Sequence, residues 1–231
     1  MDKCAGCETA TPTLYCVECG AKYCAECDAS VHKLANFRTH NRKPLSALSA
    51  DDVPLRFKWT SRDSPNAATF PETNICASKT GGYQFWNATV VGDAEIPTAK
   101  GTYVWAVKVT NTAEGYIMIG VAPNTINVNH ADNHESEGWY FYCLNGTLYS
   151  GPPENIVCKE YVPGYKGAGV GDIVTVKVSV GGDNEEMAKV EFQVNGKDFG
   201  VAFEEVPVKK TPLVPVVLFY TPKDSVQIVN V

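Results

Sequence analysis

Apolar and polar residues alternate along the chain from about residue 57 onward. The clearest case is Asp172–Val180, where Val174, Val176, Val178 and Val180 fall on one face and Thr175, Lys177 and Ser179 on the other. A period of two is that of a β-strand with one face buried and the other face in solvent. We therefore predict a half-buried strand here.

Two Asn-Gly pairs predict turns between such strands. Asn195-Gly196 separates two alternating arms within Val190–Phe203, and Asn145-Gly146 separates Trp139–Cys143 from Thr147–Tyr149. Asn and Gly tolerate the positive φ angles that a tight hairpin requires, so hairpins are expected at both pairs. Further strands are expected at Tyr103–Thr110, Tyr116–Val121, Leu213–Phe219 and Val226–Val229.

The fold class follows from these many short strands. Gly, Pro, Asn and Asp interrupt the chain often, and no useful length of helical periodicity appears. This pattern is typical of a β-sandwich or barrel, so residues 57–231 are expected to form one all-β domain. The protein as a whole is expected to be mainly β.

Residues 1–44 lack the alternating pattern. They contain too few large aliphatic residues to build an adequate core unaided. Short strands are expected at Leu14–Tyr15 and Lys22–Tyr23, and a short helix over Asp28–Ala35, with Asp28 or Ser30 near its start. Residues 45–56 are rich in Ser, Ala and Asp and are expected to form a linker between domains 1–44 and 57–231.

Cysteine and histidine recur at short intervals in this first domain, which holds six of the chain's nine cysteines and two of its four histidines. Eight such ligands in four pairs suit two tetrahedral zinc sites. Disulfides are the alternative, but the first residues, MDKCAGCE, lack the apolar core of a signal peptide. Two Zn²⁺ ions are therefore expected. The eight candidate ligands are Cys4, Cys7, Cys16, Cys19, Cys24, Cys27, His32 and His40.

Four ligand pairs can share two ions in sequence or alternately. Alternate sharing ties distant pairs together, which explains how so short a segment holds a shape. It assigns Cys4, Cys7, Cys24 and Cys27 to the first zinc, and Cys16, Cys19, His32 and His40 to the second. Eight ligands leave no open coordination position, so both ions are expected to be structural and to supply folding free energy.

The order of these ligands resembles the B-box zinc finger, in which two ions are bound in this alternating manner. The phrase Cys24-Ala-Glu-Cys27-Asp28-Ala-Ser-Val-His32 is particularly similar, and the resemblance covers about residues 1–43. Asp28 directly follows Cys27, and either residue is a candidate ligand. Cys27 is preferred because thiolate binds zinc better and keeps the two-residue spacing.

An ordered series of segments in the second domain resembles the SPRY domain, a bent β-sandwich, over about residues 101–230, with 57–100 supplying the first strands. The segments are Thr102–Val109, Ile117–Ala122, Gly138–Phe141, Leu148–Gly151, Gly171–Val176, Val190–Gly196, Gly200–Phe203 and Pro212–Val217. The version found in tripartite-motif ubiquitin ligases begins with Leu-Asp-Pro, which is absent, and has Trp-Glu-Val where this chain has Trp105-Ala-Val. Only three residues precede Cys4, so no RING finger is expected, nor a coiled coil. The chain is expected not to be an enzyme.

The SPRY resemblance implies a protein-recognition module in which loops at one end of the sandwich bind a peptide or a partner's surface. Candidate loops are 60–66, Pro123–Glu137 and Tyr220–Asp224. Tyr220, Thr221 and Pro222 align with pocket positions of peptide-binding relatives, although the usual pocket tryptophan is missing. The alternative is that Tyr220 simply packs at the end of the sandwich.

Charge narrows the choice of partners. The net charge of −6 lies in the larger part of the chain, since residues 51–231 hold 14 Lys and Arg against 21 Asp and Glu. This argues against binding to a nucleic-acid backbone, which depends on clustered cations. No apolar stretch approaches the length of a membrane span, and a cytoplasmic location is expected, with a nuclear one left open.

Several other conspicuous residues are expected to have only a structural role or none. His130 and His134 are expected to lie in a solvated loop, Gly164–Gly171 in a flexible loop, and Cys76, Cys143 and Cys158 to be buried or idle thiols. The aromatic residues expected in the core are Trp86, Trp105, Trp139, Phe141, Phe192 and Phe203.

The sequence thus predicts a zinc-dependent adaptor. The SPRY domain would bind one protein or peptide partner, and the B-box would contact another or self-associate. The alternatives are a non-catalytic component of a ubiquitin-ligase complex, and a B-box regulator of transcription or RNA.

Overall fold

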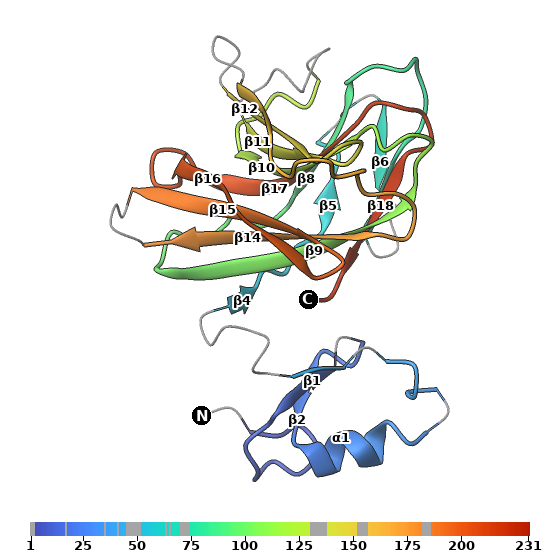
Figure 1. Ribbon diagram of the computed structural model, residues 1–231, viewed down its shortest axis with the longest axis vertical. Coiled ribbons are helices and arrows are strands. Elements are labelled where there is room, and N and C mark those ends of the chain that lie inside the picture. Colours follow the sequence, from blue (N-terminus) through green and yellow to red (C-terminus); the bar gives the residue numbers. More distant parts are fainter. Residues whose placement is uncertain are drawn as a thin grey trace. The chain divides into compact units, whose positions relative to one another are not determined.

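The computed structural model contains two compact units, Met1–Asp52 and Val53–Val229 (Figure 1). Each unit is described by itself. The structure describes residues 3–16, 18–34, 36–40, 42–44, 52–62, 64, 66–69, 74–129, 138–151, 157–181 and 186–231.

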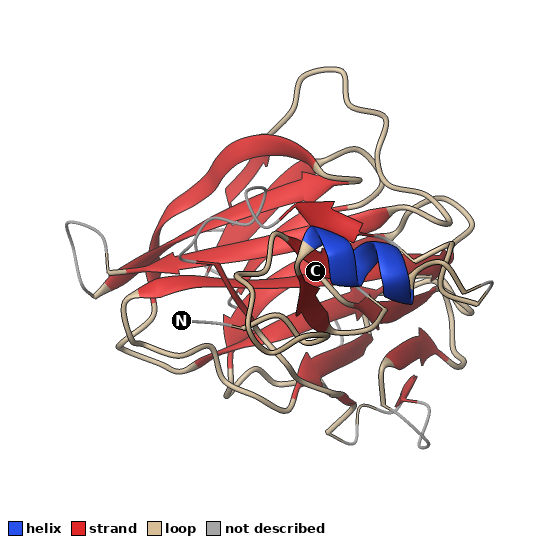
Figure 2. Cartoon of the chain, turned by 90° about the horizontal axis from the view of Figure 1, so that it is seen from below, coloured by secondary structure: helices blue, strands red, loops and turns tan. Residues whose placement is uncertain are grey.

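The first unit contains a small antiparallel sheet and a helix. Strand β1 (Leu14–Cys16) pairs with β2 (Ala21–Tyr23) on one side and with β3 (Arg42–Pro44) on the other. The helix α1 (Ala25–Val31) follows β2. The strands predicted at Leu14–Tyr15 and Lys22–Tyr23 are confirmed. Among the described residues α1 is the only helix (Figure 2), and it is not long and apolar enough to cross a lipid bilayer.

The predicted position of this helix was wrong. It begins at Ala25 rather than Asp28, and its N-cap is Cys24, whose backbone is extended and whose side chain makes no capping hydrogen bond. Asp28 lies inside the helix with its side chain turned toward His32, so it cannot cap the first turn. The start of the helix is therefore set by a candidate zinc ligand and not by a capping side chain.

The second unit is a sandwich of two antiparallel sheets, which form two layers in Figure 1. Within the described residues, sheet I has seven strands. In sheet order they are β13 (Val157–Glu160), β12 (Thr147–Gly151), β11 (Gly138–Tyr142), β10 (Ile117–Pro123), β17 (Leu213–Phe219), β8 (Ala88–Gly92) and β5 (Trp59–Thr60).

Sheet II has eight strands in the same described part of the chain. Seven follow in the order β16 (Lys197–Pro207), β15 (Met187–Val194), β14 (Ile173–Val180), β9 (Gly101–Asn111), β18 (Ser225–Val229), β7 (Cys76–Lys79) and β6 (Ala67–Thr69). The eighth, β4 (Asp52–Pro54), pairs with β9. Of the predicted linker 45–56, residues 45–51 lie outside the described residues and 52–54 form this strand.

The alternation in the sequence translates directly into burial. In β14 the residues Val174, Val176, Val178 and Val180 are buried while the residues between them are half-exposed, as predicted. The hairpin at Asn195-Gly196 joins β15 to β16, and both turn residues have positive φ angles of 52° and 78°. The loop at Asn145-Gly146 joins β11 to β12, and Gly146 has a φ angle of 72°.

Sheet I is buried on both of its faces. Alternate residues of β17, such as Val217 and Phe219, face the core between the sheets, while Val216 and Leu218 belong to a second cluster on the outer face. Burial on both faces explains why β10 and β17 are continuous apolar runs rather than alternating ones. We call this second group the outer cluster. Its buried members are Trp86, Val91, Met118, Ala122, Val128, Tyr140, Tyr142, Val214, Val216 and Leu218.

The predicted core aromatics are all packed, but not in one place. Trp105, Phe141, Phe192 and Phe203 lie in the core between the sheets and Trp139 packs against it. Trp86 belongs to the outer cluster instead. Cys143 is buried, Cys76 is half-buried and Cys158 is exposed.

Candidate metal centre and partner surface

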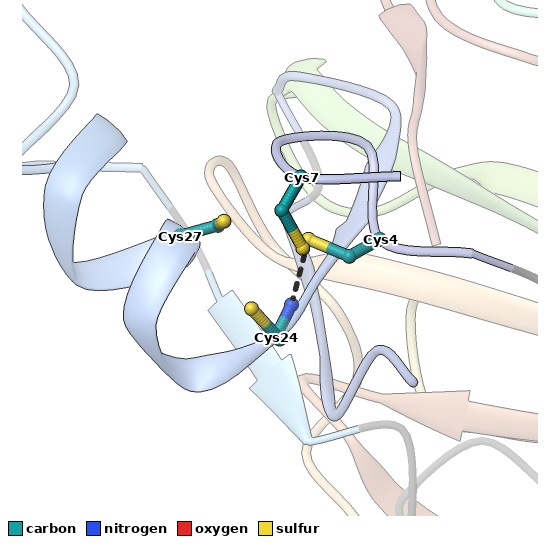
Figure 3. A group of neighbouring side chains, drawn as sticks. All are labelled: Cys4, Cys7, Cys24 and Cys27. Atoms are coloured by element: carbon teal, nitrogen blue, oxygen red, sulfur yellow. Dashed lines mark hydrogen bonds between the residues drawn. The ribbon is translucent and has the colours of Figure 1, made fainter. Parts of the chain in front are cut away.

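The first ligand cluster joins a loop to the start of α1. Cys4 and Cys7 lie on the loop, Cys24 is the N-cap of α1, and Cys27 is in its first turn. Figure 3 shows their four sulfur atoms converging, and all four lie within 4.8 Å of one another. Four sulfurs at about 2.3 Å from a tetrahedral zinc would be about 3.8 Å apart. The cluster therefore fits one zinc ion.

Local backbone geometry prepares this cluster for a cation. The amide of Cys24 donates a hydrogen bond of 3.2 Å to Cys4 Sγ, and this bond is the largest cause that lowers the pKa of the Cys4 thiol (Figure 3). Hydrogen bonding to the neighbouring Cys24 sulfur raises the pKa of Cys27 to about 12, because this bond stabilises the protonated form of the Cys27 thiol. A bound zinc ion would stabilise all four sulfurs as thiolates, because a coordinated thiol is deprotonated.

Gly6 permits the close approach of the loop to the helix. A Cβ atom at this position would lie 2.8 Å from Cβ of Cys27 and 2.9 Å from its sulfur. Real Cβ atoms do not approach other atoms so closely. Of the two residues between Cys4 and Cys7, Gly6 therefore has no space for a side chain if Cys27 is to reach the same centre.

The second cluster contains Cys16 at the end of β1, Cys19 in the following turn, His32 directly after α1, and His40. His32 Nε2 lies 3.1 Å from Cys16 Sγ, and His40 Nδ1 lies 3.3 Å from Cys19 Sγ. Two thiolates and two imidazoles are a usual structural zinc set. Together the two clusters fit two structural zinc ions, in the alternating assignment expected from the sequence.

Cys27 and Asp28 were both candidate ligands of the first zinc, and the position of Asp28 decides between them. Its carboxylate lies 2.9 Å from His32 Nδ1 and 3.8 Å from the guanidinium of Arg42. The other nitrogen of His32 faces the cysteine sulfurs. The main-chain oxygen of Asp28 lies 2.9 Å from Nδ1 and accepts its hydrogen bond, while the carboxylate contributes its charge beside the ring. Asp28 thus orients His32 on the side away from the sulfurs, and Cys27 belongs to the first cluster.

The candidate partner surface lies over the outer cluster of sheet I. The ring of Tyr220 is 5.2 Å from that of Tyr116 and 5.3 Å from that of Trp86, measured between centroids. Tyr220 and Tyr116 are half-exposed while Trp86 is buried. A tryptophan therefore lies beside Tyr220, but it is Trp86, which is far away in the sequence and was expected in the core. Tyr220 also packs at the end of the sandwich, as the alternative interpretation holds.

The three predicted pocket residues differ in exposure. Tyr220 and Pro222 are half-exposed, whereas Thr221 is buried at 8% exposure. The Thr221 amide donates a hydrogen bond of 3.2 Å to the Asp224 carboxylate, so this residue shapes the turn. Its hydroxyl finds no hydrogen-bond partner among the described residues. In the structure, Thr221 thus offers little surface to a partner.

Parts of the other candidate loops, residues 63, 65 and 130–137, lie outside the described residues, and so do His130 and His134. In the described part of the first of these loops, the guanidinium of Arg62 donates a hydrogen bond to the main-chain oxygen of Asn124. Asn124 follows the end of β10 that pairs with Leu213, whereas Tyr220 lies beyond the other end of that pair, where Ile117 is opposite Phe219. This contact therefore does not extend the candidate surface at Tyr220.

The two clusters and the two-sheet architecture define a protein with a small zinc-binding domain and a β-sandwich. Comparison with family sequence models matches the B-box zinc finger at residues 1–45 and the SPRY domain at residues 102–230. The chain belongs to the SPRY domain family and carries a B-box zinc finger before that domain. These two parts make it a zinc-binding protein-interaction module.

Solved structures share the sandwich fold. The SPRY domain of human HERC1 has a TM-score of 0.54 at 21% identity, covering 73% of this chain and 96% of that one. A human SPRY domain gives 0.54 at 16% identity, with coverages of 71% and 94%. The PSpry domain of TRIM65 gives 0.52 at 10% identity, with coverages of 76% and 90%. The search of curated proteins found no match. At these identities the likeness supports the fold alone.

Proposed function

We propose that this protein is a non-enzymatic adaptor whose SPRY domain binds a short peptide or a protein surface at Tyr220 and Pro222. The B-box would hold a second partner or a second copy of the chain. The zinc ions would keep that domain folded.

The observation that carries the proposal is the half-exposed Tyr220 ring above the outer cluster. Sandwich ends and their loops are where rigid scaffolds present recognition residues. Tyrosine supplies a large contact area with few side-chain torsions to freeze, so it is favoured at interfaces. Packing against Tyr116 and Trp86 holds the ring in place, which lowers the entropic cost of binding.

The proposal is tested by selecting random phage-displayed peptides against the zinc-loaded chain. A synthetic copy of a selected peptide is then titrated into the wild type and Tyr220→Ala. We expect the variant to bind about tenfold more weakly, as for a central aromatic contact. Val201→Ser, at an exposed position of β16, is the control and should bind equally well. Equal binding to Tyr220→Ala, or no selected peptide, would count against this surface.

The absence of enzymatic activity is a separate part of the proposal. A ubiquitination assay with E1, E2, ubiquitin and the purified chain alone should give no product. Product formed without an added ligase would overturn it.

A further inference from the structure

Lys79 is a lysine inside the sandwich. It is the last residue of β7, where burial alternates so that Lys79 shares the inward face with Ala77, and it is 1% exposed. Its ammonium donates hydrogen bonds to the main-chain oxygen of Phe85 at 2.6 Å, to Oδ1 of Asn87 at 2.7 Å and to the main-chain oxygen of Tyr220 at 2.8 Å. An ammonium has three donors, and all three are used.

A buried ammonium is costly, so its retention needs an explanation. Burial lowers the pKa of Lys79 to about 8, and the nearby charge of Asp224 offsets part of this effect. No ion pair of Lys79 is found in the part of the chain that the structure describes, so neutral acceptors stabilise the charge. A methionine would fill the same space without the desolvation cost, but it would leave the three oxygens without this donor.

The three acceptors belong to two segments far apart in the sequence. One segment is 80–87, which displays Tyr83 at 90% and Phe85 at 39% exposure. The other is the turn Tyr220–Asp224. Backbone bonds add to the connection, because the amide of Phe85 donates to the oxygen of Tyr220 at 3.0 Å and the amide of Lys79 donates to that of Asp224 at 3.0 Å.

We propose that Lys79 is a positioning residue that fixes segment 80–87 and the Tyr220 turn as one two-part binding surface. The binding part of this inference rests on the proposed function. Tyr83 and Phe85 then contact the same partner as Tyr220. Segment 80–87, Thr-Gly-Gly-Tyr-Gln-Phe-Trp-Asn, carries no acidic or basic side chain. The part of the partner that it meets is therefore an uncharged stretch of peptide bearing an apolar side chain.

The positioning role is tested without any partner, by amide hydrogen exchange in Lys79→Met. The amides of Phe85 and Tyr220 should exchange at least about tenfold faster than in the wild type, because both segments lose their shared donor. The amide of Val176 in β14 should be unchanged, and so should all three amides in the control Lys210→Met, which alters an exposed lysine. Unchanged exchange at Phe85 and Tyr220 would overturn the inference.

A second variant guards against misfolding of Lys79→Met. Asn87→Ala removes one acceptor and keeps the lysine. It should accelerate exchange at Phe85 by about threefold with Val176 unaffected. If exchange at Phe85 in this variant matches the wild type while Lys79→Met is unfolded, the lysine has only a general structural role and the inference fails.

The binding part uses the phage-selected peptide described above. Lys79→Met should bind it about tenfold more weakly, as should the double variant Tyr83→Ser with Phe85→Ser, and Lys210→Met should bind it normally. Equal affinity of Lys79→Met and wild type would overturn the positioning role and leave the proposed function standing. Failure to select any peptide would count against the proposed function, and the exchange measurement would still decide the role of Lys79.

Discussion

The carboxylate of Asp28 lies 2.9 Å from Nδ1 of His32, while Nε2 of the same ring lies 3.1 Å from the sulfur of Cys16. The carboxylate and the candidate zinc ligands thus lie at opposite nitrogens of one imidazole. With Nε2 facing the cysteine sulfurs, Nδ1 of His32 donates its proton to the main-chain oxygen of Asp28, which lies 2.9 Å away. The carboxylate oxygen beside Nδ1 accepts no hydrogen bond from the described residues and acts on the ring through its charge.

Removal of that carboxylate should weaken the second zinc site. Asp28→Asn is expected to lower zinc affinity by about tenfold, the lower end of the range for outer-shell partners, since the main-chain oxygen of Asp28 also lies 2.9 Å from Nδ1. Competition with a chromophoric chelator measures the change. Glu26→Gln, an exposed acid on the same helix, should behave as the wild type. Equal zinc affinities of the wild type and Asp28→Asn would show that the Asp28 carboxylate does not contribute to the second zinc site.

Zinc chelation should unfold the first domain and leave the sandwich intact. Among the described residues of 3–44, the buried hydrophobic side chains are Cys4, Tyr15 and Cys16, and two of these three are zinc ligands. The metal must therefore supply most of the folding free energy there. We expect chelator to abolish amide protection in residues 3–44 and to leave the melting temperature of residues 57–231 unchanged, with recovery on adding zinc. A common collapse of both would contradict independent folding.

Truncations on the two faces of sheet I should have similar costs. Leu148 lies in the core between the sheets and Leu218 in the outer cluster, and both are fully buried. Each Leu→Ala change should lower the free energy of unfolding by about 2–5 kcal/mol. Urea titration of the two variants measures this. A cost below about 1 kcal/mol for Leu218→Ala alone would show that the outer face is solvated.

The buried lysine should leave a signature in the pH dependence of stability. The folded-state pKa of Lys79 is about 8 against an ordinary value of 10.5, so between these values the unfolded chain binds more protons. Stability from this group therefore rises with pH across that window, by at most about 3 kcal/mol. Urea unfolding at about pH 7.5 and about pH 9.5 should show the rise in the wild type and not in Lys79→Met. If the free energy of unfolding changes equally with pH in the wild type and in Lys79→Met, the lowered pKa of Lys79 is refuted.

Most of the fold was predictable because it depends on local patterns. Alternation in Asp172–Val180 fixed the inward face of β14, and the Asn-Gly pairs fixed two hairpin loops. The zinc clusters were predictable for a related reason: ligand spacing is written in the sequence, and only the grouping of the pairs required an argument from topology.

The predictions from sequence failed at positions whose structure depends on residues far away in the chain. The start of α1 was misplaced because Cys24, a poor capping residue, is held there by the first cluster. Lys79 was not singled out at all, because its acceptors are two main-chain oxygens and one amide, and main-chain oxygens have no sequence signature. The buried position of Thr221 depends on its bond to Asp224, which alignment to a family pattern cannot show.

The interleaving of the two ligand sets has a consequence for how the first domain responds to metal supply. Cys16 and Cys19 lie between Cys7 and Cys24, so ordering the chain around either ion brings the ligands of the other into range. The first ion to bind pays most of the chain entropy, and the second binds a partly organised site. Occupancy should therefore be cooperative, with a steep transition between an empty unfolded domain and a fully loaded folded one. The domain would then fold only above a sharply defined concentration of free zinc. Any partner that recognises the folded B-box would be bound only above that concentration.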